Sequence, residues 1–243
     1  MHVVILIPTY KEVENLKRLI PLLYTQIYSM RPDILFSTLV VDDNSPDGTR
    51  ALCEVFVRTY PHFFVSYGDK CGIGAAMKRG YEYALQELQA DAVVTYEADF
   101  VFLPDIIIDL VDGLSVADVV LASRVNESDF YSSSYSRRIG HFVANTVIAQ
   151  WIGGLTMVRE HTAAGRAIRV KHVLDTVDLN VLPNGYAFFP AILYTLAGKT
   201  QRFKELPVLF QDRSVGISKM KLSSAAQELS TALIYALRFR FSK

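Results

Sequence analysis

The chain has 243 residues, of which 51% are hydrophobic and 21% are charged. It can therefore bury the core of one large α/β domain or two small ones, and it is not a disordered chain. The 25 basic and 25 acidic residues cancel, which argues against a dedicated nucleic-acid-binding protein. Two cysteines, Cys53 and Cys71, exclude a disulfide framework and a four-cysteine zinc site, so we expect free buried thiols in a reducing compartment.

The N-terminal sequence does not have the pattern of a secretory signal. Residues 3–7 are apolar but are stopped at once by Pro8, with no basic segment before them. Residues 139–158 and 179–198 lack charged side chains. The second stretch is interrupted by prolines and glycine, which predicts a turn and a short buried helix. The first stretch is long enough to span a bilayer but carries His141, Asn145 and Gln150, so we expect a helix at the membrane surface or inside the domain.

The first 125 residues alternate short apolar runs with helical patterns. The runs cover residues 3–7, 35–41, 63–65, 92–95 and 119–122, and helical spacing covers 12–28, 49–60 and 73–88. Continuous apolar strands separated by helices are typical of a parallel sheet buried on both faces. The sequence therefore predicts an α/β fold of the doubly wound type, mostly parallel with helices on both faces. Ligands of such folds bind at the carboxyl ends of the strands.

The second half of the chain is less regular. It predicts helices at 135–152 and 187–196, a strand at 202–210 and an amphipathic helix at 222–241. The last helix ends in Arg238, Phe239, Arg240 and Phe241. Cations suit a helix C-terminus, which is sufficient to explain them, and the alternative is docking to anionic lipid head groups.

Polar residues follow the first two predicted strands. Pro8, Tyr10 and Glu12 come after the first, and the tandem Asp42-Asp43 follows the second. Two adjacent carboxylates at a buried strand end repel and raise each other's pKa, so we expect at least one of them to bind a ligand. The next residues, 47–49, predict a structural turn at Asp47-Gly48 with Thr49 as a helix N-cap.

Three further segments contain groups suited to phosphate or metal binding. Residues 68–76 form a glycine-rich turn before a helix, which either packs against the sheet or passes a diphosphate over free backbone N–H groups. Glu97 and Asp99, two positions apart after a strand, can point toward one hard cation such as Mg²⁺ or Mn²⁺. Arg213 and Lys219 flank a Gly/Ser turn, which fits either a phosphate clamp or a solvated loop.

Taken in order, these motifs resemble glycosyltransferase family 2, with its Rossmann-like GT-A nucleotide-sugar-binding fold. Within that family the chain is similar to the dolichyl- and polyprenyl-phosphate mannosyltransferases. The resemblance runs from residue 3 to about residue 219. It rests on the segments IPTYKEVEN, VVDDNSPDGT, GIGAAMKRG, EAD, SR, RRIGHFVAN, GYAFFPAILY, KELPVLF and DRSVGISK.

The resemblance implies a role for each matching residue. The residues that it places at the nucleobase and ribose are Pro8, Tyr10, Glu12 and Asp43. Those at the divalent metal, Mg²⁺ or Mn²⁺, are Glu97 and Asp99. Those that complete the catalytic set are Arg124 and Arg137 at the acceptor phosphate, with Arg213 and Lys219 at the donor diphosphate.

The chain also departs from the family pattern. Glu97 stands for the first Asp of the usual Asp-x-Asp motif, and Val101, where a polar residue is common, cannot ligate a metal. His141 replaces a small hydroxyl residue, and Ala191 replaces a Glu near the sugar. The tract 160–166 differs from the family's Asp-x-Thr-Ser-Gly-Phe-Arg. These changes predict a weakened metal site.

The expected activity is inverting transfer of a hexose, with mannose from GDP-mannose favoured, to a polyprenyl or dolichyl phosphate. The acceptor phosphate is largely a dianion at pH 7, with a second pKa near ~6, so no general base is expected. We expect a catalytic domain at 1–220 and a C-terminal helix at 221–243, ending before any membrane domain. The protein would then lie peripherally on the cytoplasmic face of a membrane, with a small membrane-anchor subunit as a candidate partner and no nucleic acid.

Two alternatives remain open at this stage. One is a glycosyltransferase of the same family acting on a glycan or another hydroxyl acceptor. The other is a catalytically impaired nucleotide-sugar-binding or scaffold protein, which the changes at Val101, Ala191 and 160–166 motivate.

Overall fold

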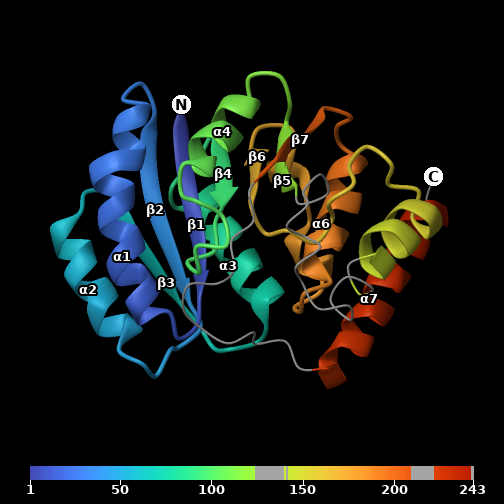
Figure 1. The fold of residues 1–243 in the computed structure, drawn as a ribbon, viewed down its shortest axis with the longest axis horizontal. Helices are drawn as coiled ribbons and strands as arrows, with labels where there is room; N and C mark the ends of the chain where they lie inside the picture. Colours follow the sequence, from blue (N-terminus) through green and yellow to red (C-terminus); the bar gives the residue numbers. More distant parts are fainter. Residues whose placement is uncertain (124–139, 141, 209–221, 242–243) are drawn as a thin grey trace.

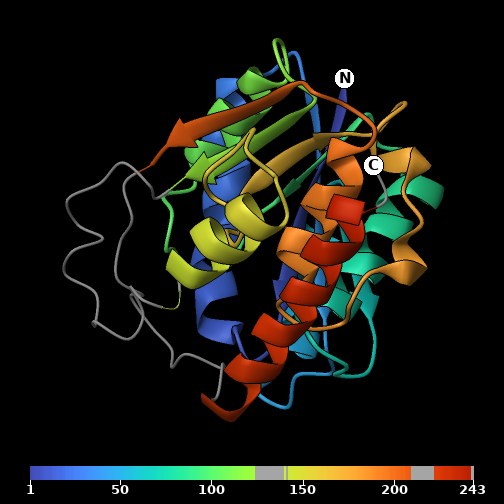
Figure 2. The same ribbon diagram turned by 90° about the vertical axis from the view of Figure 1, so that its right-hand side faces the viewer.

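The computed structural model describes residues 1–123, 140, 142–208 and 222–241, the last segment with its side chains from residue 227 on (Figure 1). Within these residues a seven-stranded sheet forms the centre of the molecule, in the order β3-β2-β1-β4-β6-β5-β7. Helices cover both of its faces (Figures 1 and 2). The strands are β1 (His2–Thr9), β2 (Leu35–Asp42), β3 (Phe63–Tyr67), β4 (Ala92–Thr95), β5 (Val119–Ser123), β6 (Arg166–Arg169) and β7 (Phe203–Pro207).

The first four strands run parallel, as the sequence predicts. β1 pairs with β2 and β4, and β2 pairs with β3. The connections are α1 (Val13–Leu22), which continues as the short π-helix η1 (Leu23–Ile27) and the 3-10 helix η2 (Tyr28–Met30), then α2 (Thr49–Thr59) and α3 (Ile73–Gln86). The five strands and the three helical regions that the sequence predicts in the first 125 residues are confirmed. Because every strand of this group ends at the same edge, the residues that follow them are brought together.

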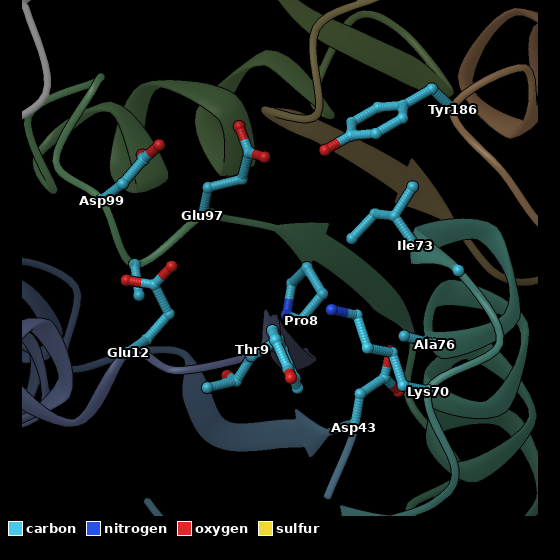
Figure 3. Close-up of a pocket in the computed structure, with 13 residues that line it drawn as sticks. Pro8, Thr9, Glu12, Asp43, Lys70, Ile73, Ala76, Glu97, Asp99 and Tyr186 are labelled. Carbon is cyan, nitrogen blue, oxygen red and sulfur yellow. The ribbon is translucent and has the colours of Figure 1, made fainter. Parts of the chain in front are cut away.

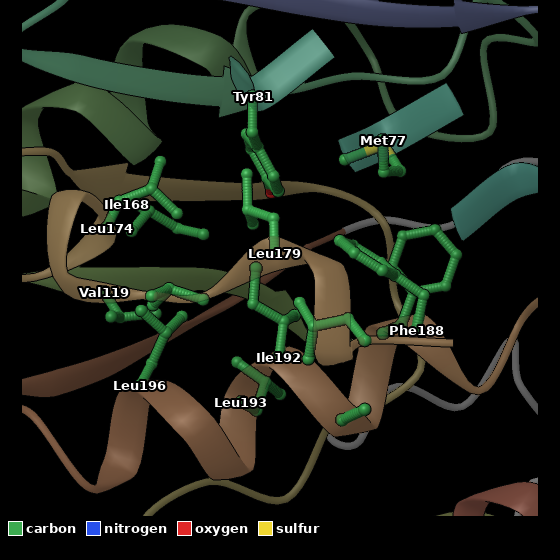
Figure 4. Close-up of a cluster of buried hydrophobic side chains, with 14 of the residues drawn as sticks. Met77, Tyr81, Val119, Ile168, Leu174, Leu179, Phe188, Ile192, Leu193 and Leu196 are labelled. Atoms are coloured by element: carbon green, nitrogen blue, oxygen red, sulfur yellow. The ribbon is translucent and has the colours of Figure 1, made fainter. Parts of the chain in front are cut away.

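The two faces of the sheet bury two separate cores. Ile5 and Ile7 of β1 belong to the core under α1, α2 and α4 (Ile106–Gly113), whereas Leu6 between them faces the core under α3 and α6 (Phe188–Ala197). Successive strand residues point to opposite faces, so an unbroken apolar run fills both cores. Figure 4 shows the second core, where Tyr81 of α3 and Ile192 of α6 approach the strands. Burying each such side chain stabilises the fold by roughly 1.5–3 kcal/mol.

The antiparallel strand β6 was not predicted. It lies between β4 and β5 and runs opposite to both. Its four residues include two arginines, so neither its length nor its hydropathy distinguishes it from a loop. Arg166 is fully buried; its Nη1 donates to the Phe189 carbonyl at 3.0 Å and its Nη2 donates to the Ala163 carbonyl. Burial lowers the pKa of Arg166 to about 10, which still leaves it charged at neutral pH.

Helix α4 was also missing from the sequence prediction. Its residues Ile106, Ile107 and Ile108 are buried, and a short continuous apolar run does not distinguish a helix from a strand by periodicity.

Both cysteines are free, as expected, but only Cys53 is buried. Burial raises the pKa of the Cys53 thiol to about 12. The expectation of a buried thiol is wrong for Cys71, which is exposed in the turn before α3.

The remaining elements cover one end of the sheet. After β5 come η4 (Val143–Ile152), β6, η5 (Leu174–Thr176) and η6 (Leu179–Val181), then α6, β7 and α7 (Leu222–Phe241). These agree with the predicted helices at 187–196 and 222–241, with the predicted strand and with the described part of the helix at 135–152. α7 lies against α6 and η4 (Figures 1 and 2). Among the described helices, none has the length and apolar character needed to cross a bilayer.

Candidate functional site

A pocket opens at the carboxyl ends of β1, β2 and β4. It brings together all six predicted site residues that the structure describes: Pro8, Tyr10, Glu12, Asp43, Glu97 and Asp99. Three residues that were not predicted as site residues, Thr9, Ala98 and Tyr186, also line the pocket. Figure 3 shows Glu12, Glu97 and Asp99 on one side of the pocket, Asp43 and Lys70 on the other, and Tyr186 above Ile73.

The two adjacent aspartates at the end of β2 have different surroundings. Asp42 is fully buried and accepts hydrogen bonds from the Ser45 backbone N–H at 3.0 Å and from its hydroxyl at 2.5 Å. Asp43 lines the pocket, and its Oδ1 accepts from Nη2 of Arg79 at 2.8 Å. Burial raises the pKa of Asp43, with a smaller contribution from Asp42, while Arg79 opposes the rise. The pair therefore divides into a turn-stabilising and a pocket-facing carboxylate.

The loop after Asp43 holds the loop after β1 in place. Asp47 accepts from the Val13 backbone N–H at 3.2 Å and from the Thr49 hydroxyl at 2.7 Å. The Ser45 hydroxyl accepts from the Lys11 backbone N–H at 2.9 Å. These contacts agree with the predicted structural role of residues 47–49, but the N-cap of α2 is Gly48 and Thr49 is the first residue of the helix. They link the strand-end loops that carry Tyr10 and Asp43.

Lys70 and Tyr10 line the pocket together with Asp43. The Lys70 Nζ lies 3.4 Å from the centre of the Tyr10 ring, a close cation–π contact. Lys70 belongs to the glycine-rich turn before α3, where Gly72 adopts a positive φ of 105°. At this turn a Cβ on Gly72 or Gly74 would collide with the backbone of residues 183–184, so the glycines permit close packing. The ligand role of this turn stays a prediction.

The acidic pair after β4 lies at the opposite side of the pocket. Glu97 and Asp99 both line it, and Oδ1 of Asp99 accepts from the Val101 backbone N–H at 3.3 Å. Phe100 has a φ of 56°, so the chain turns sharply between Asp99 and Val101. Within the described residues no cluster of three or more His, Cys, Asp or Glu side chains is arranged to hold a metal. Any cation here would depend on this carboxylate pair and on ligands from a substrate.

The Glu160 side chain organises the start of the unusual tract 160–166 through local hydrogen bonds. One oxygen of Glu160 accepts from the Thr162 N–H, the Thr162 hydroxyl and the Ala163 N–H, at 2.8–3.1 Å. This carboxylate caps the turn that leads into β6. Ala191 is fully buried in α6, in the core rather than at the pocket surface.

Some predicted residues cannot be placed. Those outside the described part of the chain are Arg124, Arg137, His141, Arg213 and Lys219. Their expected roles at the two phosphates remain predictions.

The chain matches one protein-family model and several known proteins over most of its length. A family model described as "Glycosyl transferase family 2" matches residues 4–171. The chain is 29% identical to the polyprenol monophosphomannose synthase of Mycolicibacterium smegmatis, covering 98% of this chain and 88% of that protein. It is 31% identical to the undecaprenyl-phosphate mannosyltransferase of Micrococcus luteus, covering 90% and 88%. A dolichol-phosphate mannosyltransferase of Pyrococcus furiosus is 28% identical over 91% of this chain, which spans 60% of that relative.

Solved structures share the fold at low sequence identity. Mannosyl-3-phosphoglycerate synthase from Rubrobacter xylanophilus superposes with a TM-score of 0.67 at 17% identity, covering 98% of this chain and 73% of that one. Glucosyl-3-phosphoglycerate synthase from Mycobacterium tuberculosis, solved with Mn²⁺, UDP and phosphoglyceric acid, gives 0.65 at 16% identity, covering 97% and 78%. These likenesses confirm the predicted GT-A fold.

Proposed function

The chain belongs to glycosyl transferase family 2, and on that premise we propose that it transfers mannose from GDP-mannose to a polyprenyl or dolichyl phosphate, with inversion at the anomeric carbon. Glycosyl transfer itself follows from the family. The polyprenyl-phosphate acceptor and the mannosyl group are supported by the names of relatives that match nearly the whole chain. The GDP donor is the further step of the proposal.

The observation that carries the proposal is the pocket itself. Its base-facing side would use the Asp43 carboxylate, which can accept hydrogen bonds from the ring N–H groups of a nucleobase, and the Tyr10 ring, which offers a flat apolar surface. Its other side carries the acidic pair Glu97 and Asp99. A nucleoside diphosphate laid between them would place its phosphates near the carboxylates, where a divalent cation could neutralise them.

The acidic pair suits such a cation. Mg²⁺ is commonly held by one or two protein carboxylates together with substrate phosphates and water, so two side chains are enough when the donor is bound. Glu97 and Asp99 would hold the cation, with no ligand from Val101. When bound, a divalent cation stabilises negative charge on the leaving nucleoside diphosphate.

The reaction needs alignment of two anionic groups more than proton transfer. The acceptor phosphate is already a nucleophile at neutral pH, so no side chain is assigned as a general base. Arg124 and Arg137 would hold the acceptor phosphate, and Arg213 with Lys219 would stabilise the departing diphosphate. A single displacement from the face opposite the leaving group gives inversion.

Exposed apolar side chains on and beside η4 and α7 support attachment of the protein to a membrane surface. We define the η4–α7 surface by its exposed residues, which are Phe142, Trp151, Ile234, Leu237, Arg238, Arg240 and Phe241. Trp151 is 66% exposed and Phe241 is 83% exposed. The rings of Phe142 and Trp151 meet edge to face, and Ile234, Leu237 and Phe241 recur at helical spacing along α7.

Apolar side chains next to arginines fit an anionic bilayer surface, where the rings enter the head-group region and the cations meet lipid phosphates. We propose that the protein lies peripherally on the cytoplasmic face of a membrane and contacts it through this surface. In this proposal residues 1–220 are the catalytic domain, and the C-terminal helix at 221–243 contributes to membrane contact. A small membrane-anchor subunit could add to the attachment.

The decisive experiment is a donor panel. Labelled GDP- and UDP-sugars are offered to the purified chain with vesicles containing polyprenyl phosphate, with Mg²⁺, Mn²⁺ or excess EDTA. We expect labelled lipid from GDP-mannose, and loss of product with EDTA that is reversed by added metal. If a free glycan offered in parallel is labelled and the lipid is not, the lipid acceptor is refuted. If calorimetry shows nucleotide binding but neither acceptor is labelled, the chain is an impaired binding protein. Product formation that survives exhaustive EDTA would refute the role of Glu97 and Asp99.

A further inference from the structure

One residue of the pocket lining, Tyr186, belongs to a segment that contacts helices α3 and α7. Of the described residues that line the pocket, Tyr186 alone comes from beyond residue 100. It is 39% exposed and directs its ring into the pocket between Glu97 and Ile73 (Figure 3). The position of this ring therefore depends on what holds residues 182–187.

Helix α3 holds the first part of this segment. The Lys78 Nζ donates to the Leu182 carbonyl at 3.1 Å, and the Ala75 N–H donates to the Asn184 carbonyl at 3.2 Å. Gly72 and Gly74 lack the Cβ atoms that would collide with this backbone. The N-terminus of α3 and residues 182–184 are thus packed backbone against backbone.

Helix α7 holds the second part through one carboxylate. Glu228 accepts a hydrogen bond through Oε2 from the Ala187 N–H at 2.8 Å. Ala187 is the N-cap of α6 and makes no side-chain cap of its own, and the first N–H groups of a helix have no partner within the helix. A negative charge at this end is also favoured by the helix dipole. Gly185 leaves the space that the Glu228 carboxylate occupies.

We propose that Glu228 is a positioning residue for donor binding, which acts by holding residues 185–187 so that Tyr186 stays in the pocket beside Glu97. The inference rests on the proposed function, because it takes the pocket as the nucleotide-sugar site. Tyr186 lies between Gly185 and Ala187, the two residues in contact with Glu228. Loss of the carboxylate leaves the Ala187 N–H without this partner and releases the backbone on both sides of Tyr186.

The test is calorimetric binding of GDP-mannose to the full chain, well below its unfolding temperature. We expect Glu228→Ala to weaken binding about tenfold, the lower end for one hydrogen bond to a charged group. Glu228→Gln, which keeps an acceptor oxygen, should restore most of the affinity. Gln227→Ala, on the exposed side of the same helix, is the matched control and should bind as the wild type does. Should the alanine variant not fold, Glu228→Asp, which keeps the charge but shortens the reach, takes its place.

A double-mutant cycle separates positioning from a general structural effect. In the background of Tyr186→Ala, adding Glu228→Ala should weaken binding less than twofold, because the residue it positions is gone. A full tenfold loss in that background, or wild-type affinity of Glu228→Ala alone, would overturn the inference. If the wild-type chain binds neither GDP- nor UDP-sugars, the proposed function fails, and the inference fails with it.

Discussion

The ion pair between Arg79 and Asp43 allows a quantitative prediction. Asp43 has a side chain only 8% exposed and Arg79 one that is 25% exposed, at 2.8 Å. Replacing Arg79 by Met removes the cation but leaves the carboxylate at the buried strand end. Breaking a fully buried pair costs about 3–5 kcal/mol, and a hydrogen bond to a charged group contributes about 1.5–3 kcal/mol. Because water can reach the vacated Arg79 position, we expect about 2 kcal/mol at pH 7, which is a fall of roughly 4–8 °C in Tm for a chain of this size.

The pH dependence of this loss identifies its cause. Burial raises the pKa of Asp43 in the folded protein above its unfolded value, so the folded state binds the extra proton and stability falls as pH rises through the range between those two pKa values. Arg79 opposes that rise, so Arg79→Met raises the folded pKa further. The variant should therefore approach wild-type stability at acidic pH, where Asp43 is neutral, and differ most above the raised pKa.

Urea unfolding of four proteins, the wild type, Arg79→Met, Asp43→Asn and the double variant, measures this directly from pH 4 to 8. The double variant should recover most of the stability that Arg79→Met loses, because the uncompensated charge is gone. A double variant as unstable as Arg79→Met, or a loss that does not change with pH, would show that Arg79 stabilises the fold by packing and not through Asp43.

Three further predictions concern other parts of the chain. Arg213→Ala should lower turnover about ten- to a hundredfold, the equivalent of about 1.5–3 kcal/mol, and unchanged turnover would remove Arg213 from the site. Burial lowers the pKa of His161 to about 4, so its contribution to stability, of the order of 3 kcal/mol, is present near neutral pH and is lost as pH falls from about 6.5 through 4. His161→Gln should flatten that part of the stability profile, and an equally steep profile in the variant would assign the acid sensitivity to other groups. Replacing Trp151, Ile234 and Leu237 together by Ser should reduce cosedimentation with vesicles of anionic lipid at least tenfold, whereas the exposed apolar residue Val57 of α2, changed to Ser, should have no effect. Equal cosedimentation of the two variants would mean that the η4–α7 surface does not face the membrane.

Several features could be predicted from the sequence because they are local. The apolar runs of β1, β2 and β4 lie in parallel strands, and parallel strands end at one edge, so Pro8, Asp43 and Glu97 were expected close together and do line one pocket. The tandem Asp42-Asp43 predicted a ligand role for at least one of the two carboxylates, without indicating which. Which of the two faces the pocket depends on the direction of each side chain after the strand, and on the Ser45 hydroxyl that engages Asp42.

Other features depend on segments far apart in the chain. β6 is too short and too polar to be recognised from the sequence. It forms a strand because β4 and β5 lie on either side of it and pair with its backbone N–H and C=O groups. Tyr186 lies in a segment whose glycine and proline predict only a turn. The residues on either side of it are held by hydrogen bonds to Lys78 of α3, more than a hundred residues earlier, and to Glu228 of α7, about forty residues later.

Local sequence patterns determined the layered α/β fold and the edge of the sheet where the polar strand-end residues meet. Both follow from apolar runs and helical spacings, which are periodic over a few neighbouring residues. Three other features were decided only by the folded structure: the ion pair of Arg79 with Asp43, the burial of Arg166, and the hydrogen bond from the Ala187 N–H to Glu228 next to Tyr186. Each joins groups whose hydrogen-bonding capacity is visible in the sequence but whose partner is selected by packing.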